Sequence, residues 1–169
     1  MKICRQNAYE ILRLFPITNY CMDTILSHSK KYQNSNMYKQ ESINIVIADD
    51  SEVVRKTIKK TLSELPGVKV TGCASNASAT VKLVEEIKPD AVILGIKMPG
   101  EGGLEVLKKI KETNPRIVVI IFTNYPSTQY KAMCYRYGAD YFFDRSMEFQ
   151  LLTDVFNEMA LGHFYYIYN

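Results

Sequence analysis

The sequence predicts an α/β fold, a doubly wound (βα)5 domain whose five-stranded parallel sheet is covered by helices on both faces. Short β-branched apolar runs alternate with amphipathic stretches of helical period from Ile43 onward. The apolar runs are continuous instead of alternating with polar residues, which is typical of parallel strands buried on both faces. Right-handed crossovers then bring the carboxyl ends of all the strands to one edge of the sheet.

Five segments have the pattern of buried strands. They are Ile43–Ala48, Val68–Ala74, Ala91–Leu94, Ile117–Phe122 and Tyr141–Phe143. The runs INIVIA and IVVIIF among them are dominated by β-branched residues, which favour a pleated and buried surface. Each of these segments is followed by a stretch of helical period, so the chain reads as five strand–helix units.

The helical stretches carry apolar residues every three to four positions. The first follows Ser51, a good N-cap, and ends at Pro66-Gly67. The others are Ala77–Lys88, Leu104–Glu112, Ser127–Tyr137 and Met147–Leu161. The glycine-rich stretch Gly100–Gly103 lacks the lysine and hydroxyl residue of a phosphate-binding loop, so we interpret it as a flexible connection.

Composition excludes several classes of protein. The chain has 169 residues, of which 47% are hydrophobic and 23% charged, as in an ordinary globular protein with one domain and extensions. No apolar run approaches the roughly 18–20 residues of a membrane span. The four cysteines, at 4, 21, 73 and 134, form no CxxC pair, which argues against a zinc site. We expect buried free thiols and a reducing, cytoplasmic location.

Charge divides the chain into three parts. Residues 1–36 carry five basic and two acidic side chains, which accounts for the whole net charge of +3. We expect this basic extension to be partly helical or poorly ordered, with a partner- or membrane-binding amphipathic helix and a start at Met37 as alternatives. Residues 37–161 form the predicted domain, and 162–169 a short aromatic tail. The domain has no excess of positive charge, so we expect no nucleic-acid partner.

Polar residues follow the predicted strands at their carboxyl ends. Asp49 and Asp50 follow the first strand, Thr123 the fourth and Arg145 the fifth. In doubly wound sheets the functional site lies at this edge. Adjacent carboxylates are costly unless a cation such as Mg²⁺ or a guanidinium lies between them. The alternative is structural: an N-cap with acidic residues in the first helical turn.

Four stretches of the chain resemble receiver domains of the two-component response regulators. They are IVIADDSEVVRKTIKKTL, KPDAVILGIKMPGEGGLEVLKKIKE, IVVIIFTNYPS and YGADYFFDRS, in the family's order and spacing within residues 43–160. The resemblance implies a flavodoxin-like, CheY-like fold. It also implies transfer of a phosphoryl group from a histidine kinase to an aspartate after the third strand, with Mg²⁺ bound. A hydroxyl residue and an aromatic residue then shift.

The resemblance assigns roles to individual residues. It implies that Asp50 is a direct Mg²⁺ ligand, that Asp49 is its acidic neighbour acting through water, and that Lys97 supplies a backbone carbonyl. It implies that the hydroxyl of Thr123 moves toward a phosphoryl group and that Phe142 is the aromatic switch.

Two residues depart from the family pattern. Gly95 stands where the family has its phosphoacceptor aspartate, so no acyl phosphate can form there. Arg145 stands where the family has lysine, and its forked guanidinium is no neutral replacement for a compact ammonium. We expect Mg²⁺ binding to be weak or lost, and Arg145 to fork onto Asp49 or Asp50.

The sequence therefore predicts a stand-alone receiver in phosphorelay signalling that is not an enzyme, is not phosphorylated at Gly95, and acts through protein–protein contacts. The expected partners are a histidine kinase, a phosphotransfer protein or a downstream target; the oligomeric state is not predicted. The expected contact face contains Tyr130, Met133 and Tyr137 with the switch residues, although these aromatics can equally be packing residues.

Two alternatives stay open at this point. The chain can be an inactivated version of an ordinary phosphorylatable receiver. It can also be an aspartate-dependent phosphatase-like hydrolase on a related fold, although those enzymes have an Asp-x-Asp pair after the first strand and the aspartates here are adjacent.

Overall fold

A computed structural model of the chain describes residues 42–161. The predicted basic extension (1–36), residues 37–41 of the predicted domain and the aromatic tail (162–169) lie outside the described residues.

Five parallel strands form one sheet in the described part of the chain, in the order β2-β1-β3-β4-β5. They are β1 (Ile43–Ala48), β2 (Val68–Ala74), β3 (Ala91–Leu94), β4 (Val118–Thr123) and β5 (Tyr141–Asp144). In register, Ala48 lies beside Leu94, Leu94 beside Ile121, and Thr123 beside Asp144. The carboxyl ends of β1, β3, β4 and β5 therefore meet at one edge of the sheet. The predicted fold class is confirmed.

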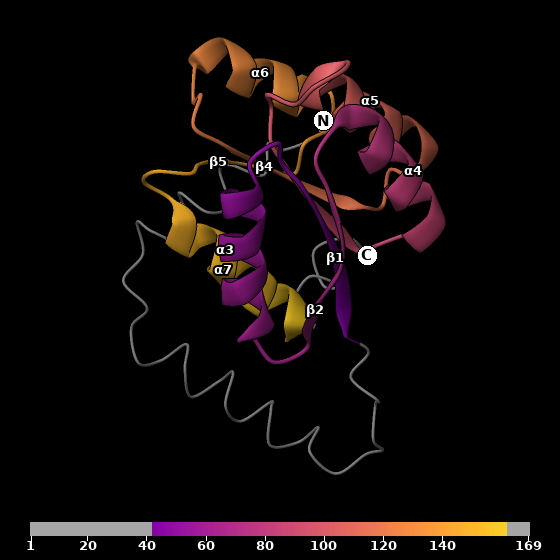
Figure 1. Cartoon of the computed structure of the whole chain (residues 1–169). Helices are drawn as coiled ribbons and strands as arrows, with labels where there is room; N and C mark the ends of the chain where they lie inside the picture. Colours follow the sequence, from indigo (N-terminus) through magenta and orange to yellow (C-terminus); the bar gives the residue numbers. More distant parts are fainter. Residues whose placement is uncertain (1–41, 162–169) are drawn as a thin grey trace, which may run out of the picture. The chain divides into compact units, whose positions relative to one another are not determined.

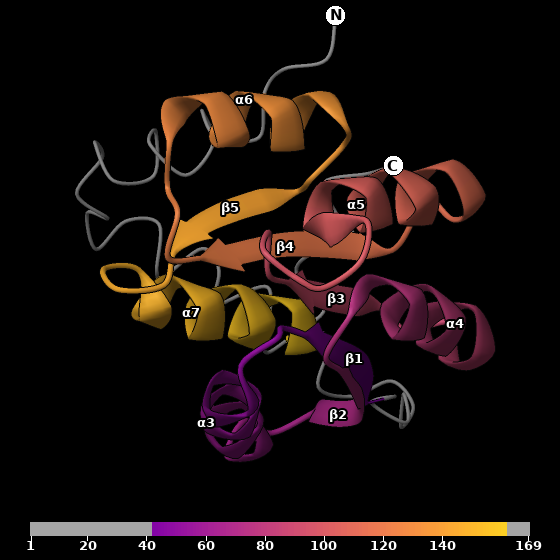
Figure 2. The same cartoon turned by 45° about the horizontal axis from the view of Figure 1, so that its top comes forward.

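Helices cover both faces of this sheet (Figures 1 and 2). They are α3 (Glu52–Ser63), α4 (Ala77–Ile87), α5 (Gly102–Thr113), α6 (Thr128–Arg136) and α7 (Phe149–Ala160). Helices α3 and α7 lie on one face, and α4, α5 and α6 on the other. The predicted Ser51 cap is confirmed, because its hydroxyl accepts the N–H of Val54 at 3.5 Å.

Alternate residues of each central strand supply the two cores, as the period of two requires. In β1, Ile45 and Ile47 pack with α3 and α7, while Val46 and Ala48 pack with the other three helices. All four side chains are fully buried. Burial on both faces explains why β1 reads as a nearly continuous apolar run.

The beginning of α5 was predicted wrongly. Gly102 and Gly103 are its first residues and do not form a flexible connection. A Cβ on Gly103 would lie 2.1 Å from the backbone oxygen of Gly95 and 2.9 Å from the Cα of Ile96. Glycine is needed here because the start of α5 packs directly against the chain that leaves β3.

The cysteines follow the prediction only in part. Cys134 on α6 is fully buried, and burial raises the pKa of its thiol to about 12. Cys73 on β2 is exposed, so the expectation of a buried thiol is wrong there. It lies on an edge strand, where a side chain can reach solvent. The other two cysteines are outside the described residues.

A buried ion pair joins α5 to Asp140, the residue before β5. Lys111 Nζ lies 2.6 Å from Asp140 Oδ2 and donates to the carbonyl of Ile117 at 2.6 Å. The same Asp140 oxygen accepts the N–H of Val119 at 2.7 Å. Both side chains are largely shielded, so loss of one partner leaves the other charge buried.

This pair predicts a difference between two lysines of α5. Lys111→Ala should lower the free energy of unfolding by about 3 kcal/mol, because the Asp140 carboxylate would lose its buried partner. Lys109→Ala is the matched control, since Lys109 pairs with Glu101 at the exposed surface. Urea denaturation of both variants measures the difference. Equal effects of the two substitutions would contradict the assigned role of Lys111.

Candidate functional site

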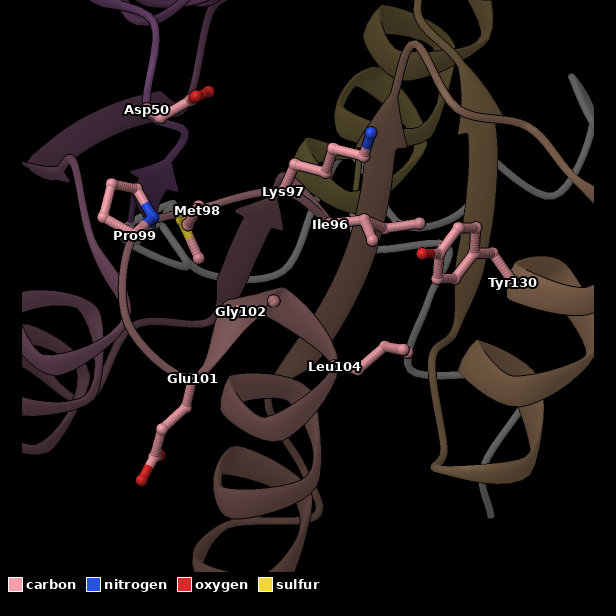
Figure 3. A pocket seen from close by; sticks show the side chains of 10 residues that line it. Asp50, Ile96, Lys97, Met98, Pro99, Glu101, Gly102, Leu104 and Tyr130 are labelled. Atoms are coloured by element: carbon pink, nitrogen blue, oxygen red, sulfur yellow. The ribbon is translucent and has the colours of Figure 1, made fainter.

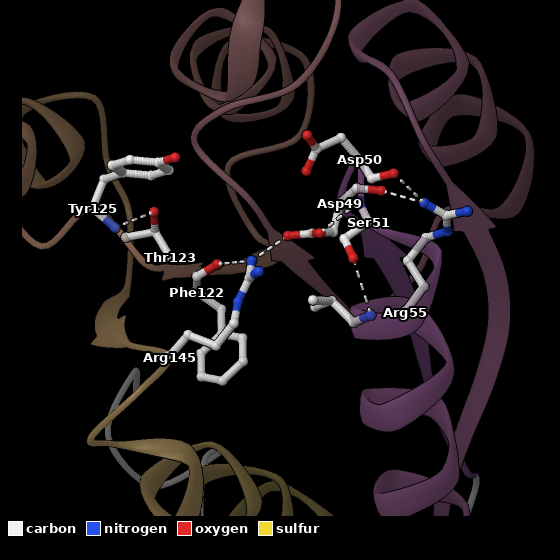
Figure 4. A network of polar contacts seen from close by, with 9 residues as sticks. Asp49, Asp50, Ser51, Arg55, Phe122, Thr123, Tyr125 and Arg145 are labelled. Atoms are coloured by element: carbon white, nitrogen blue, oxygen red, sulfur yellow. Dashed lines mark hydrogen bonds and ion pairs between the residues drawn. The ribbon is translucent and has the colours of Figure 1, made fainter.

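Four residues from four strands meet at the carboxyl edge of the sheet. Asp49 follows β1, Gly95 follows β3, Thr123 ends β4 and Arg145 follows β5. Asp49 and Thr123 are both buried. Figure 4 shows the Arg145 side chain crossing this edge toward Asp49, with Thr123 beside it. The structure thus brings together the residues that the sequence placed at the strand ends.

An ion pair between Asp49 and Arg145 occupies the centre of this edge. The Arg145 Nη2 atom contacts Asp49 Oδ2 and also donates to the carbonyl of Phe122 at 3.0 Å. The second Asp49 oxygen, Oδ1, accepts the backbone N–H of Ser51 at 3.0 Å. Both carboxylate oxygens of Asp49 therefore already have protein partners (Figure 4).

Arg145 reaches Asp49 through one nitrogen and does not form the fork that was expected. Its guanidinium carbon lies 5.5 Å from the centre of the Phe122 ring. Its Nε atom is buried and has no hydrogen-bond partner among the described residues. Asp49 and Asp50 were both expected as possible partners of Arg145, and the ion pair is with Asp49.

Burial dominates the ionisation of Asp49. Desolvation raises the pKa of its carboxyl above the ordinary value of 3.8, while the Arg145 charge and the Ser51 N–H act in the opposite direction. The guanidinium thus offsets part of the cost of holding a carboxylate that is only 3% exposed.

Gly95 borders the Asp49 carboxylate. A Cβ at this position would lie 2.7 Å from Asp49 Oδ2, well inside the about 3.5 Å of ordinary contact. The next nearest atoms, Asp49 Cγ and the backbone oxygen of Ala48, would be 3.4 and 3.5 Å away. The carboxylate of Asp49 therefore takes up the space that a side chain at position 95 needs.

Asp50 lies apart from the ion pair. Its side chain is exposed, and Figure 4 draws no hydrogen bond or ion pair from its carboxylate. The backbone carbonyls of Asp49 and Asp50 accept from Nη1 of Arg55, at 2.6 and 3.0 Å. Sequence reasoning missed Arg55; a basic residue one turn into the helix that follows the aspartates was the available signal. Arg55 fixes the loop that carries both aspartates.

The donors at this edge do not fit a divalent metal. Mg²⁺ needs several free oxygens in octahedral geometry, with one or two carboxylates. Asp49 already binds a guanidinium and an amide, and Gly95 contributes no carboxylate. Among residues 42–161, no group of three acidic, histidine or cysteine side chains is placed to hold a metal ion. The side chain of Lys97, whose carbonyl was a predicted ligand, lies with Nζ 3.5 Å from the centre of the Tyr125 ring.

The predicted switch residues are both in the interior. The Thr123 hydroxyl accepts the backbone N–H of Tyr125 at 3.1 Å. Phe142 is only 4% exposed and packs in the core shared with α4, α5 and α6. Of the two expectations for Phe142, a contact residue or a packing residue, this structure therefore has the packing one.

The remaining residues of the expected contact face belong mainly to the packing around α6. Tyr130 and Tyr137 are half-buried against the same core. Met133 is 40% exposed and is the accessible apolar residue of the three.

A pocket of about 440 Å³ lies between α6 and the loop after β3 (Figure 3). Ile96, Met98 and Tyr130 contribute apolar surface, and Asp50 and Lys97 contribute opposite charges. In Figure 3, Tyr130 lies across the pocket from Asp50. The pocket is thus beside the ion pair of Asp49, but Asp49 itself does not line it.

Within residues 42–161, no helix has both the length and the apolar character that a membrane span requires.

Known proteins similar to this chain share one type of domain. The family model of the response regulator receiver domain matches residues 45–157. The nitrate/nitrite response regulator protein NarL of Escherichia coli K12 is 34% identical over 128 residues, which are 75% of this chain and 58% of that protein. The response regulator GacA of Pseudomonas aeruginosa is 38% identical over 81 residues, 48% of this chain and 38% of that protein. The chain thus spans 58% or less of these two relatives.

Solved structures of response regulators have the same fold as this chain. The response regulator domain of Thermotoga maritima CheB has a TM-score of 0.61 and 26% identity, and the match covers 72% of this chain and 95% of that one. A LuxR-family DNA-binding response regulator from Staphylococcus aureus has a TM-score of 0.65 and 27% identity, with 70% and 98% covered. The CheY-like fold is therefore confirmed.

The ion pair predicts how stability depends on pH when Arg145 is removed. Arg145→Met should lower the free energy of unfolding by about 3 kcal/mol at neutral pH, because the buried Asp49 carboxylate would lose its partner. A raised folded-state pKa means that the folded chain holds this proton more tightly than the unfolded chain. The Asp49 contribution to stability is then present at low pH and is lost as pH rises through the raised pKa.

The loss in Arg145→Met should therefore shrink as the pH falls from about 7 toward about 5, as measured by urea denaturation at each pH. Asp49→Asn in the Arg145→Met background is the control, and its difference from Arg145→Met should change with pH in the same window. A loss that is the same at both pH values would show that Asp49 does not depend on Arg145.

Proposed function

The chain belongs to the response regulator receiver domain family, and from this premise we propose that it is a signalling receiver whose own site does not accept a phosphoryl group. The observation that carries this proposal is Gly95, which places no carboxylate after β3. An acyl phosphate forms only on a carboxylate, so the family's reaction has no acceptor at this position.

The neighbouring carboxylates do not replace the acceptor in this proposal. Asp49 is buried, and its two oxygens are bound by Arg145 and by the N–H of Ser51. Asp50 follows on an exposed turn, and the ion pair of Arg145 is with Asp49. Arg145, at the position of the cation that the family uses to contact a phosphoryl group, is thus already bound by Asp49 and by the carbonyl of Phe122.

We also propose that Mg²⁺ affinity is weak or lost. The loss of a carboxylate at position 95 and the occupation of Asp49 leave Asp50 as the one acidic side chain of this set without a hydrogen-bond or ion-pair partner recorded in the described residues. The positive charge of Arg145, held against Asp49, further repels a divalent cation. The domain then stays in one arrangement whether or not the metal is present.

The output of such a domain is a protein–protein contact. We propose a histidine kinase, a phosphotransfer protein or a downstream target as the partner class, in the cytoplasm, and no enzymatic reaction of the described domain. Residues 37–169 hold equal numbers of basic and acidic side chains, which favours a protein partner over nucleic acid. Val53, which is 73% exposed, and Met147, which is 82% exposed, are apolar residues available to contact such a partner.

The proposal predicts that the chain forms no covalent adduct with a small phosphodonor. Incubation with phosphoramidate and Mg²⁺, followed by intact-mass measurement, should show no added phosphoryl group. A receiver domain with aspartate at the position of Gly95 is the positive control in the same tube. An adduct that peptide mapping locates on Asp49 or Asp50 would contradict the proposal.

A second prediction concerns the metal alone. Millimolar Mg²⁺ should leave the amide resonances of Asp49, Asp50 and Ser51 unchanged in nitrogen–proton correlation spectra, because no set of free carboxylates is placed to bind it. The resonances of residues 81–87 in α4, which carries none of the three site residues, serve as the internal reference. Saturable shifts confined to the three site residues would show that the metal site survives.

A further inference from the structure

We propose that Gly95 and Arg145 are a matched pair: phosphoryl acceptance is blocked at both positions, and an aspartate at 95 restores it only if Arg145 is also replaced by lysine. This inference rests on the proposed function and deepens it. If the chain were an ordinary receiver that lacks one carboxylate, Gly95→Asp alone would restore phosphoryl acceptance.

The first step is steric. Gly95 does not have a positive φ, so its backbone conformation is open to other residues. A Cβ at this position would nevertheless lie 2.7 Å from Asp49 Oδ2. The obstacle to a side chain at position 95 is therefore the carboxylate of Asp49, and whether that carboxylate can move decides the outcome.

The second step is that Asp49 is held on both sides. Oδ1 accepts the N–H of Ser51 at the start of α3, and Oδ2 contacts Arg145. The Arg145 Nη2 atom that contacts Asp49 also donates to the carbonyl of Phe122 at 3.0 Å. The backbone N–H of Arg145 donates to the carbonyl of Thr123 at 2.9 Å. Arg145 is thus anchored to β4, and it holds Oδ2, the Asp49 atom that lies nearest a Cβ at position 95.

The third step is electrostatic. An aspartate at position 95 would place a second carboxylate beside a buried first one, which is unfavourable unless a cation contacts both. Nη2 of Arg145 is already shared between Asp49 and Phe122. The other cation at this edge, Lys97, has its Nζ over the ring of Tyr125. The Arg145 nitrogen nearest Asp49 and the Lys97 ammonium thus both have contacts that an aspartate at position 95 would have to compete with.

Lysine at position 145 changes both conditions. Its ammonium is compact, has three donors that rotate freely, and is carried on a flexible stem, whereas the guanidinium is planar and wider. A lysine can therefore contact two carboxylates in turn and lets Asp49 rotate away from position 95. Glycine at 95 and arginine at 145 tolerate each other for the same reason: the small residue leaves room for the carboxylate that the large cation holds.

The test uses three variants of the full chain, namely Gly95→Asp, Arg145→Lys and the double variant, each incubated with phosphoramidate and Mg²⁺. A carboxylate introduced at position 95 attacks the phosphorus, the P–N bond breaks, an O–P bond forms, and ammonia leaves with the protons that its nitrogen already carries. Intact mass then reports one added phosphoryl group.

We expect the adduct in the double variant and none in the parent, in Gly95→Asp or in Arg145→Lys. An adduct on Gly95→Asp that forms as fast as on the double variant would overturn the matched pair while leaving the proposed function intact. No adduct on a folded double variant would also overturn it. An adduct on the parent chain would overturn the proposed function itself, so the two failures are distinguishable.

A thermal-unfolding cycle tests the steric step without any phosphodonor. Gly95→Ala adds only the Cβ, and it should lower the melting temperature by about 5 °C or more in the parent but by clearly less in the Arg145→Lys background. Glu105→Ala, on the exposed side of α5, is the control and should give the same small shift in both backgrounds. Equal shifts for Gly95→Ala in the two backgrounds would show that Arg145 does not determine the space available at position 95.

Discussion

The contact between Arg145 and Asp49 is the interaction on which the rest of the site depends. It joins the end of β5 to the end of β1 across two intervening strands, and through Nη2 it includes the carbonyl of Phe122 on β4. A buried carboxylate is costly without a cation, and in this structure the cation beside Asp49 is the guanidinium of Arg145. The polar edge of the sheet thereby becomes part of the scaffold.

The two predicted switch residues of this chain are already held in the interior. In the family, chemistry at the strand ends moves a hydroxyl and an aromatic residue. In this chain the Thr123 hydroxyl already accepts the Tyr125 N–H, and Phe142 is packed inward against α6. Under the proposed function, the ion pair keeps the site closed, and the surface that a partner meets is not altered by phosphorylation at the strand ends.

Much of the fold follows from local patterns, whereas the errors arise where two elements meet. Strand and helix positions followed from continuous apolar runs and from caps such as Ser51. Gly103 was misread because glycine breaks helices by propensity, while its need here comes from the close approach of α5 to Gly95. The exposure of Cys73 and the burial of Phe142 depend on which helices cover each face. Whether Arg145 pairs with Asp49 or with Asp50 depends on how the chain turns after β1, and the spacing of residues in the sequence does not predict that turn.

The most direct test of this account is a crystal structure of the unmodified chain grown with Mg²⁺ and beryllofluoride. We expect Arg145 on Asp49 Oδ2, an intact bond from Arg145 to the Phe122 carbonyl, and no metal or beryllium at the strand ends. A metal ion bound between Asp49 and Asp50, with the Arg145 side chain displaced from Asp49, would contradict the central claim that the guanidinium has taken over the site.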